Sequence, residues 1–265
     1  MITYTQEKIL KALAKYKYLT ASQLVDLGIS SSIYTVRKYS TDLQKQKLIK
    51  KSIYSQTIQK NDKTKSVKLE GLNFLDTEGV RILKNDLDLE NIKYPQKHKL
   101  AFSNDYFHRV YMISTCISFD LWIEKTKQEG FFLIDFHNQE TTIKITDDLT
   151  IKPDIIVNFN QNYAIIEVWA GIDKDYIISK LSKLFKAIAS KKVSEFLGYQ
   201  KAPRVLNIFK DPETMERVKQ TLKTEPFFDN AINKGLFYFT TTEQIKEKFN
   251  IWHDINSKVI DIQDF

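Results

Sequence analysis

Apolar residues recur at helical spacing three times within the first fifty residues of the chain. Each run follows a serine or threonine, whose side chain can accept a hydrogen bond from the first free backbone N–H groups of a helix. Three short helices in succession are therefore expected, and this order is typical of a helix-turn-helix. The expected helices run from Thr5, as N-cap, to between Tyr16 and Leu19; from Ala21 to Leu27, capped by Thr20; and from Ser30–Ser32 to about Gln46.

Two apolar segments, 48–54 and 67–75, then frame a polar and charged stretch at 60–65. This pattern predicts two strands around a basic tip, followed by a helix capped by Asp76 or Thr77. A helix-turn-helix with such a hairpin is the winged-helix arrangement, in which the third helix enters the major groove of DNA and the hairpin contacts the backbone or minor groove.

Charge strengthens this interpretation, because it is concentrated at one end of the chain. The net charge is +7, yet residues 1–70 hold thirteen lysines and one arginine against five acidic residues, a balance of +9. Such a footprint favours a nucleic acid as partner. Arg37 is expected to contact a base, because its guanidinium group can form two hydrogen bonds with guanine. The hairpin lysines are expected to contact phosphates. Solvated surface charges and a winged helix that binds protein are the alternatives. The expected DNA-binding residues are Tyr34, Thr35, Arg37, Lys38, Thr41, Lys60, Lys63 and Lys65.

From residue 100 onward, short apolar runs alternate with longer helical patterns. This alternation predicts a mixed sheet flanked by helices, within an α/β (α+β) chain. The single cysteine, Cys116, lies in an apolar helical run and is interpreted as a buried structural thiol. The expected strands are 131–136, 140–145, 155–157, 163–166, 204–209, 235–240 and a pairing tail from Ile251; the expected helices are 100–127, 173–190, one that starts at Asp211-Pro212, and 242–249.

The domain organisation follows from a segment of mixed charge and little apolar periodicity. Residues 85–99 are the expected linker, between a winged-helix domain at 1–84 and a second domain at 100–265. No apolar run is long enough to span a bilayer and no amino-terminal signal pattern is present, so a cytoplasmic protein without a membrane partner is expected.

One acidic pair stands at the ends of two strongly apolar runs. Asp154 opens the run 155–157 and Glu167 closes the run 163–166. If the two runs pair as an antiparallel hairpin, both carboxylates meet at one end of the sheet, where they could bind a hard divalent cation. The helix that follows carries Lys180 and Lys183 on one side, where they could face a phosphate.

This order, with Pro153-Asp154, a strand-ending Glu167 and a helix lysine, resembles the PD-(D/E)XK nuclease core. It is similar in particular to the replication-relaxation and MobC/TraX-type plasmid relaxase family, which implies a restriction-endonuclease-like sheet. The resemblance implies catalytic roles for Asp154, Glu167 and Lys180, and matches His108 to a histidine that precedes the core. It departs at Trp169, where the general motif has lysine and the relaxase-like subgroup has an acid. Tryptophan can neither bind a metal nor polarise a phosphate.

Two functions follow from these patterns. The first is a plasmid or mobile-element protein that binds double-stranded DNA and nicks it with Mg²⁺ or Mn²⁺ held by Asp154 and Glu167, Lys180 or Lys183 standing in for the missing motif lysine. The second is a catalytically inactive, nuclease-like DNA-binding protein in replication, transfer or transcription control, which Trp169 favours. A second copy of the chain, forming a homodimer, is a further partner to test.

Overall fold

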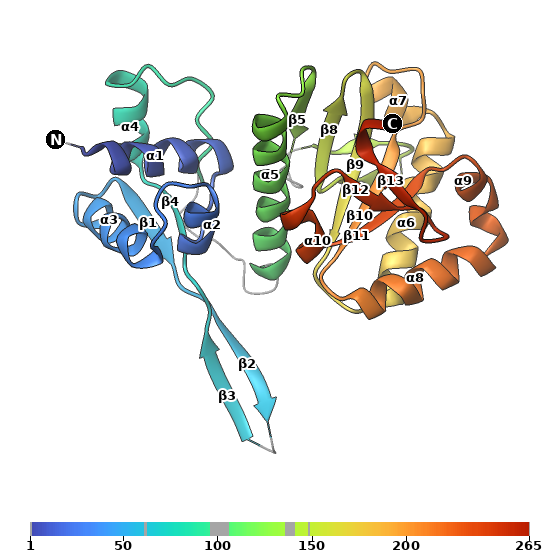
Figure 1. Ribbon diagram of the computed structural model, residues 1–265, viewed down its shortest axis with the longest axis horizontal. Helices are drawn as coiled ribbons and strands as arrows, with labels where there is room; N and C mark the ends of the chain where they lie inside the picture. Colours follow the sequence, from blue (N-terminus) through green and yellow to red (C-terminus); the bar gives the residue numbers. More distant parts are fainter. Residues whose placement is uncertain (1, 61–62, 96–105, 136–140, 148, 265) are drawn as a thin grey trace. The chain divides into compact units, whose positions relative to one another are not determined.

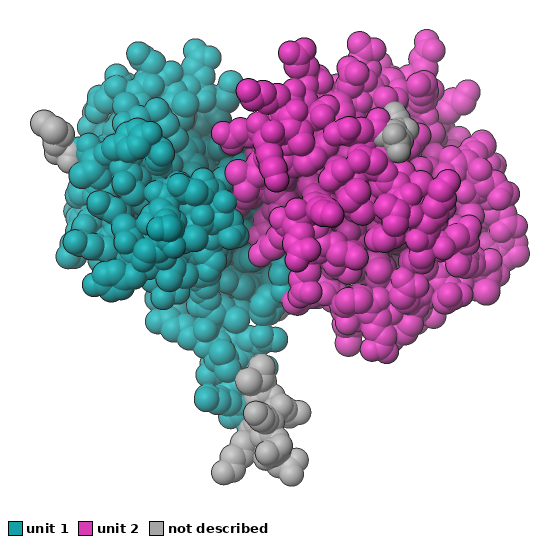
Figure 2. Space-filling model, in the orientation of Figure 1, with its two compact units in different colours: residues 1–113 teal, residues 114–265 magenta. Residues whose placement is uncertain are grey.

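The computed structural model describes residues 2–60, 63–95, 106–135, 141–147 and 149–264, the side chains at 58–60, 63 and 264 excepted. The chain is mixed α/β and forms two compact units, residues 1–113 and 114–265 (Figure 2). The boundary falls within helix α5, Tyr106–Thr126, so this helix contributes to both units. Part of the expected linker belongs to the first unit, because Lys93 N donates to Ala14 O at 2.8 Å; residues 96–99 lie outside the described residues.

Three helices open the first unit, and their caps are set by local sequence. The predicted cap Thr20 is confirmed, and among the three serines 30–32 expected to supply the next cap, Ser32 is the N-cap. The first helix begins earlier than predicted, because Thr3 rather than Thr5 is its N-cap. Thr3 and Gln6 form a capping box, in which each side chain bonds the backbone of the other. The helices are α1 (Tyr4–Tyr16), α2 (Ala21–Asp26) and α3 (Ile33–Lys45).

The predicted two-stranded hairpin consists of four strands in two successive pairs. An inner antiparallel pair is buried in part against the helices, and an outer pair extends away from the helices of its unit (Figure 1). The stretch 60–65, expected as the tip, thus contains the end of β2 and the start of β3. Strands can form in this polar segment because their backbone hydrogen bonds do not require apolar side chains. Helix α4 (Thr77–Asn85) follows with Asp76 as its cap. The strands are β1 (Ile49–Ser52) with β4 (Leu72–Leu75), and β2 (Ser55–Lys60) with β3 (Lys63–Lys68).

A seven-stranded mixed sheet forms the centre of the second unit, with strand order β13-β12-β11-β10-β9-β8-β5. The middle strands β9, β10 and β11 are parallel to each other, and the strands on either side are antiparallel to their neighbours. The predicted mixed sheet is confirmed. Its strands are β5 (Phe131–Asp135), β8 (Ile155–Phe159), β9 (Asn162–Trp169), β10 (Arg204–Phe209), β11 (Phe237–Thr241), β12 (Ile251–His253) and β13 (Val259–Asp261).

Helices cover both faces of this sheet (Figure 1). On one face, Phe119 of α5 contacts Phe159 and Phe249 edge-on or tilted. On the other, α6 and α8 pack on a core that includes Ile165 and Phe209. The helices after the hairpin are α6 (Lys174–Ala189), α7 (Lys192–Phe196), α8 (Pro212–Thr224), α9 (Asp229–Asn233) and α10 (Thr242–Glu247), with 3₁₀ turns at Pro226–Phe228 and Ile262–Asp264.

The expected strands and helices of the second unit occur with bounds that differ by a few residues, longer for β8 and β9 and shorter for α10. The strand expected at 140–145 is β6 (Ile143–Lys144), which pairs with β7 (Thr150–Ile151) in a small separate sheet. Cys116 is fully buried, as predicted. No helix among the described residues has the length and apolar character needed to cross a bilayer.

Candidate functional site

The β8–β9 hairpin brings the acidic pair together. Ile155 lies opposite Ile166 in the antiparallel register, so Asp154 and Glu167, one position further, lie across from each other. Both residues are almost completely buried, with 2% and 1% of their surface exposed. Asp154 Oδ2 accepts a hydrogen bond from Val168 N at 2.8 Å, which fixes the carboxylate against the end of β9.

Helix α6 places a lysine against both acids. The Nζ atom of Lys180 lies 3.2 Å from Asp154 Oδ1 and forms an ion pair with Glu167 Oε2. The helix begins at an N-cap, Asp173, and packs through a buried stripe that includes Leu181, so it directs Lys180 toward the carboxylates. The Lys180 side chain is 27% exposed, whereas the two acids are buried. A ligand would therefore approach the acids past this ammonium group.

Burial and the repulsion between the two carboxylates change the pKa values in the cluster of Asp154, Glu167 and Lys180. Burial, reinforced by the nearby Asp154 carboxylate, raises the pKa of Glu167 to about 8, although Lys180 acts in the opposite direction. Burial by itself lowers the pKa of Lys180, but the charges of Glu167 and Asp154 more than offset it and hold that pKa above its usual value. With Lys180 charged, a proton on Glu167 leaves the cluster neutral, the favourable state for buried groups.

Trp169, at the position of the missing motif lysine, is buried beside the cluster. Its indole Nε1 donates to Asn207 Oδ1 at 3.1 Å, and the Nζ atom of Lys180 lies 5.2 Å from the centre of its ring. Asn207 lies opposite Glu167 in the parallel register of β9 and β10 and is fully buried. Sequence analysis missed Asn207; the signal was a single amide within the otherwise apolar run of β10.

The carboxylates of Asp154 and Glu167 fit a Mg²⁺ or Mn²⁺ ion that keeps several of its water ligands. Among the described residues, no group of three or more histidine, cysteine or acidic side chains could hold a metal. Magnesium is nevertheless commonly bound by one or two carboxylates together with substrate phosphates. Glu167 Oε2 is buried and accepts no hydrogen bond of good geometry within the described part of the chain, so it could face a cation if Lys180 moved aside.

Lys183 and His108 were also expected at this site. Lys183 is exposed on α6, and the ion pairs described for the two carboxylates are with Lys180. His108 is half-buried on α5 and belongs to the first unit, whereas the acidic pair belongs to the second.

In the first unit, helix α3 presents to solvent most of the DNA-binding residues that were expected on it. Tyr34 is 77% exposed, a high value for an aromatic side chain. The residues Arg37, Lys38 and Thr41 are exposed as well, and Thr35 is half-buried. Thr41 Oγ1 donates to Arg37 O at 2.9 Å, and Arg37 Nη2 lies 3.7 Å from Glu70 Oε1.

The expected hairpin lysines occupy the outer pair of strands. Lys65 is exposed on β3, while Lys60 and Lys63 end β2 and begin β3, with side chains outside the described set. Two further exposed lysines, Lys51 and Lys68, flank the base of the hairpin and were missed from the sequence.

Comparisons of the chain with models of known protein families, with curated proteins and with solved structures gave no match.

Proposed function

We propose that this protein binds double-stranded DNA through its first unit and nicks it through a metal-dependent site in its second. The observation that carries the proposal is the convergence of Asp154, Glu167 and Lys180 at one end of the β8–β9 hairpin. Two carboxylates and a lysine in one place are the groups that metal-assisted phosphodiester hydrolysis needs. The resemblance of this order of residues to plasmid relaxases supports a role on a plasmid or mobile element.

Each residue of the cluster has a separate role in this proposal. Asp154 and Glu167 hold the divalent ion, and the Val168 amide keeps Asp154 oriented. Lys180, whose side chain is 27% exposed, would exchange the acids for a phosphate oxygen when DNA and ion bind. The ion, when bound, supplies Lewis-acid stabilisation of the charge that develops on the phosphate oxygens.

Binding of DNA rests on the exposed face of α3 and the lysines of the hairpin. Tyr34, Lys38 and Thr41 offer stacking, charge and hydrogen-bonding groups on one exposed helix. We expect the affinity for duplex DNA to fall steeply as salt rises, because cations that neutralise phosphates release counterions. Fluorescence anisotropy over a salt series checks this expectation, and salt-independent binding, or unchanged binding after deletion of residues 1–82, contradicts it.

The metal site is tested by thermal unfolding. Mn²⁺ at about ten times its dissociation constant should raise the melting temperature of the wild type by roughly 3–5 °C. The Asp154→Ala variant should show no rise, because one of two ligands is gone. The matched control is Asp175→Ala, which removes an exposed carboxylate on α6 and should keep the full rise. An equal rise in the wild type and in Asp154→Ala contradicts the site.

Nicking of supercoiled plasmid with Mn²⁺ then tests catalysis. The open-circular product should form with wild type and disappear with Asp154→Ala and with Glu167→Gln. Nicking by all three proteins would point to a contaminant and contradict the proposed site.

A second function, DNA binding by an inactive nuclease-like protein, is favoured by one observation. Trp169 is packed into the core and hydrogen-bonded to Asn207, and the Lys180 ammonium contacts both acids and lies 5.2 Å from the centre of this ring. In this arrangement the lysine, and not a metal, provides the positive charge beside the acids. Salt-dependent DNA binding with neither stabilisation by Mn²⁺ nor nicking would select this second function.

A further inference from the structure

A cavity of about 460 Å³ lies in the first unit, at the base of the β2–β3 hairpin. Its walls carry three cationic side chains from three different elements: Arg37 from α3, Lys51 from β1 and Lys68 from β3. One carboxylate, Glu70, also lines it. The cavity therefore holds an excess of two positive charges, contributed by segments up to 31 positions apart in the sequence.

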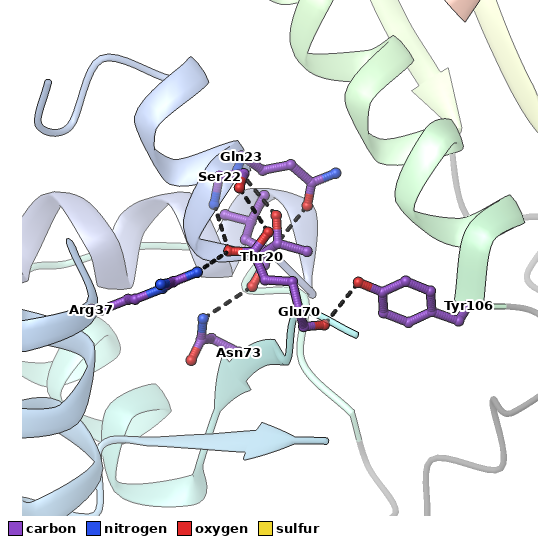
Figure 3. A network of polar contacts seen from close by, with 8 residues as sticks. Thr20, Ser22, Gln23, Arg37, Glu70, Asn73 and Tyr106 are labelled. Atoms are coloured by element: carbon purple, nitrogen blue, oxygen red, sulfur yellow. Dashed lines mark hydrogen bonds and ion pairs between the residues drawn. The ribbon is translucent and has the colours of Figure 1, made fainter. Parts of the chain in front are cut away.

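Glu70 is the centre of a polar network that fixes one wall of this cavity (Figure 3). Its carboxylate accepts hydrogen bonds from Ser22 N at 3.1 Å and Ser22 Oγ at 2.7 Å. The same carboxylate lies 3.7 Å from Arg37 Nη2, and the Glu70 backbone carbonyl accepts from Tyr106 OH at 2.8 Å. Glu70 is thus held by Ser22 and Tyr106 and, in turn, orients Arg37 without fully neutralising it.

Gly71 shapes the adjacent wall. A Cβ atom at this position would lie 2.3 Å from Lys51 Cε and 2.9 Å from Ser52 O, distances that real Cβ atoms do not tolerate. The aliphatic stem of Lys51 therefore lies directly over the glycine backbone. Because glycine has no side chain, it leaves room for Lys51 to line the cavity.

We propose that this cavity binds a backbone phosphate of duplex DNA, with Arg37, Lys51 and Lys68 as its ligands and Glu70 as the positioning residue for Arg37. This inference rests on the proposed DNA-binding function and deepens it. It gives Arg37 a phosphate in place of the guanine expected from the sequence, because a guanidinium binds two phosphate oxygens with its planar fork.

Two features favour a polymer over a small free anion. The volume lies in the range that accommodates small-molecule-sized groups, so a phosphate with its flanking sugars fits. Exposed Lys65 adds a further cation to β3 beyond the cavity, on the opposite face of the strand from Lys68. Cations spread over the hairpin match the repeating charge of a nucleic-acid backbone.

The test compares charge-matched variants of the full chain on duplexes of two unrelated sequences. Lys51→Ala with Lys68→Ala should weaken binding of both duplexes by a similar factor, about tenfold at moderate salt, and lower the salt slope by about 2. The control pair, Lys8→Ala with Lys84→Ala, removes the same charge from exposed positions on α1 and α4 and should change both quantities far less.

Glu70→Gln should change affinity in the opposite direction. It removes the negative charge beside the phosphate, so binding should tighten about threefold and the salt slope should steepen. A gain cannot arise from misfolding, which makes this variant informative even if its melting temperature falls. Asp26→Asn, at the far end of α2, is its charge-matched control and should leave affinity unchanged.

Each outcome separates the two proposals. If the wild type binds duplex DNA but the double lysine variant behaves like its control, the phosphate site is overturned and the DNA-binding function stands. If Arg37→Ala loses affinity for only one of the duplex sequences, Arg37 reads a base and the phosphate assignment is overturned. If the wild type does not bind duplex DNA, both proposals fall.

Discussion

At the scale of single residues, the most consequential group is the carboxyl of Glu167. Folding buries it beside Asp154 and raises its pKa from the ordinary value of 4.5 to about 8. A carboxyl with a raised pKa binds its proton more tightly in the folded state. The stabilisation it gives is therefore complete below pH 4.5 and is lost as the pH rises through about 8.

Glu167→Gln should flatten this pH dependence. Glutamine resembles the protonated carboxyl, so the variant should lose less free energy of unfolding than the wild type between pH 5 and pH 8, by roughly 1 kcal/mol or more. Urea denaturation at a series of pH values measures the difference. Glu247→Gln, an exposed residue on α10, is the control and should keep the wild-type profile. Parallel profiles for wild type and Glu167→Gln would contradict the raised pKa.

At the scale of elements, helix α6 links stability to the candidate site. Its N-cap is Asp173, whose Oδ1 accepts from Tyr176 N at 3.0 Å. Its buried stripe packs on the sheet and carries Lys180 to the acids. Loss of the cap should loosen the first turn, while Lys180, nearly two turns further on, remains held by packing and by two ion pairs.

Asp173→Ala should therefore lower the free energy of unfolding by about 1 kcal/mol, the usual cost of losing an N-cap. The melting-temperature rise produced by Mn²⁺ should persist in this variant. Asp175→Ala is the comparison, because it removes a carboxylate from the same first turn without a capping bond and should cost about half as much or less. Equal costs would show that the helix dipole, rather than the cap, accounts for the effect.

At the scale of the molecule, the two sets of candidate residues belong to different compact units. The cationic cavity and the α3 face lie in residues 1–113, and the acid–lysine cluster lies in residues 114–265. Each unit has buried apolar residues of its own, so a surface change in one should not alter the packing of the other.

Because the two sites belong to different units, we expect stabilisation by Mn²⁺ and affinity for duplex DNA to be lost independently. Asp154→Ala should abolish stabilisation by Mn²⁺ and leave the affinity for duplex DNA, measured without divalent ions, within about twofold of the wild type. The double variant Lys51→Ala with Lys68→Ala should lose affinity for duplex DNA and keep the full stabilisation by Mn²⁺. Anisotropy and thermal unfolding on the same protein preparations check both halves, and a loss of both properties in either variant would contradict the assignment.

Much of this molecule could be predicted from short-range patterns. The cap Thr20 and a serine cap within 30–32 could be predicted because a polar side chain that precedes a helix bonds backbone groups only three residues away. The positions of Asp154 and Glu167 were readable because two apolar runs joined by a short polar turn form a hairpin with a narrow choice of register. The true first cap, Thr3, was also encoded locally, in a capping box with Gln6.

The tertiary structure decided what depends on partners far apart in the chain. Asn207 meets Trp169 because β10 lies parallel to β9, a pairing that no local pattern specifies. Glu70 meets Arg37 only once the hairpin returns to the helices. Local sequence thus determined where helices, strands and the acidic pair occur, because hydrogen bonds and alternation act over a few residues. Folding decided which charges share a cavity, because that choice follows from the packing of whole elements.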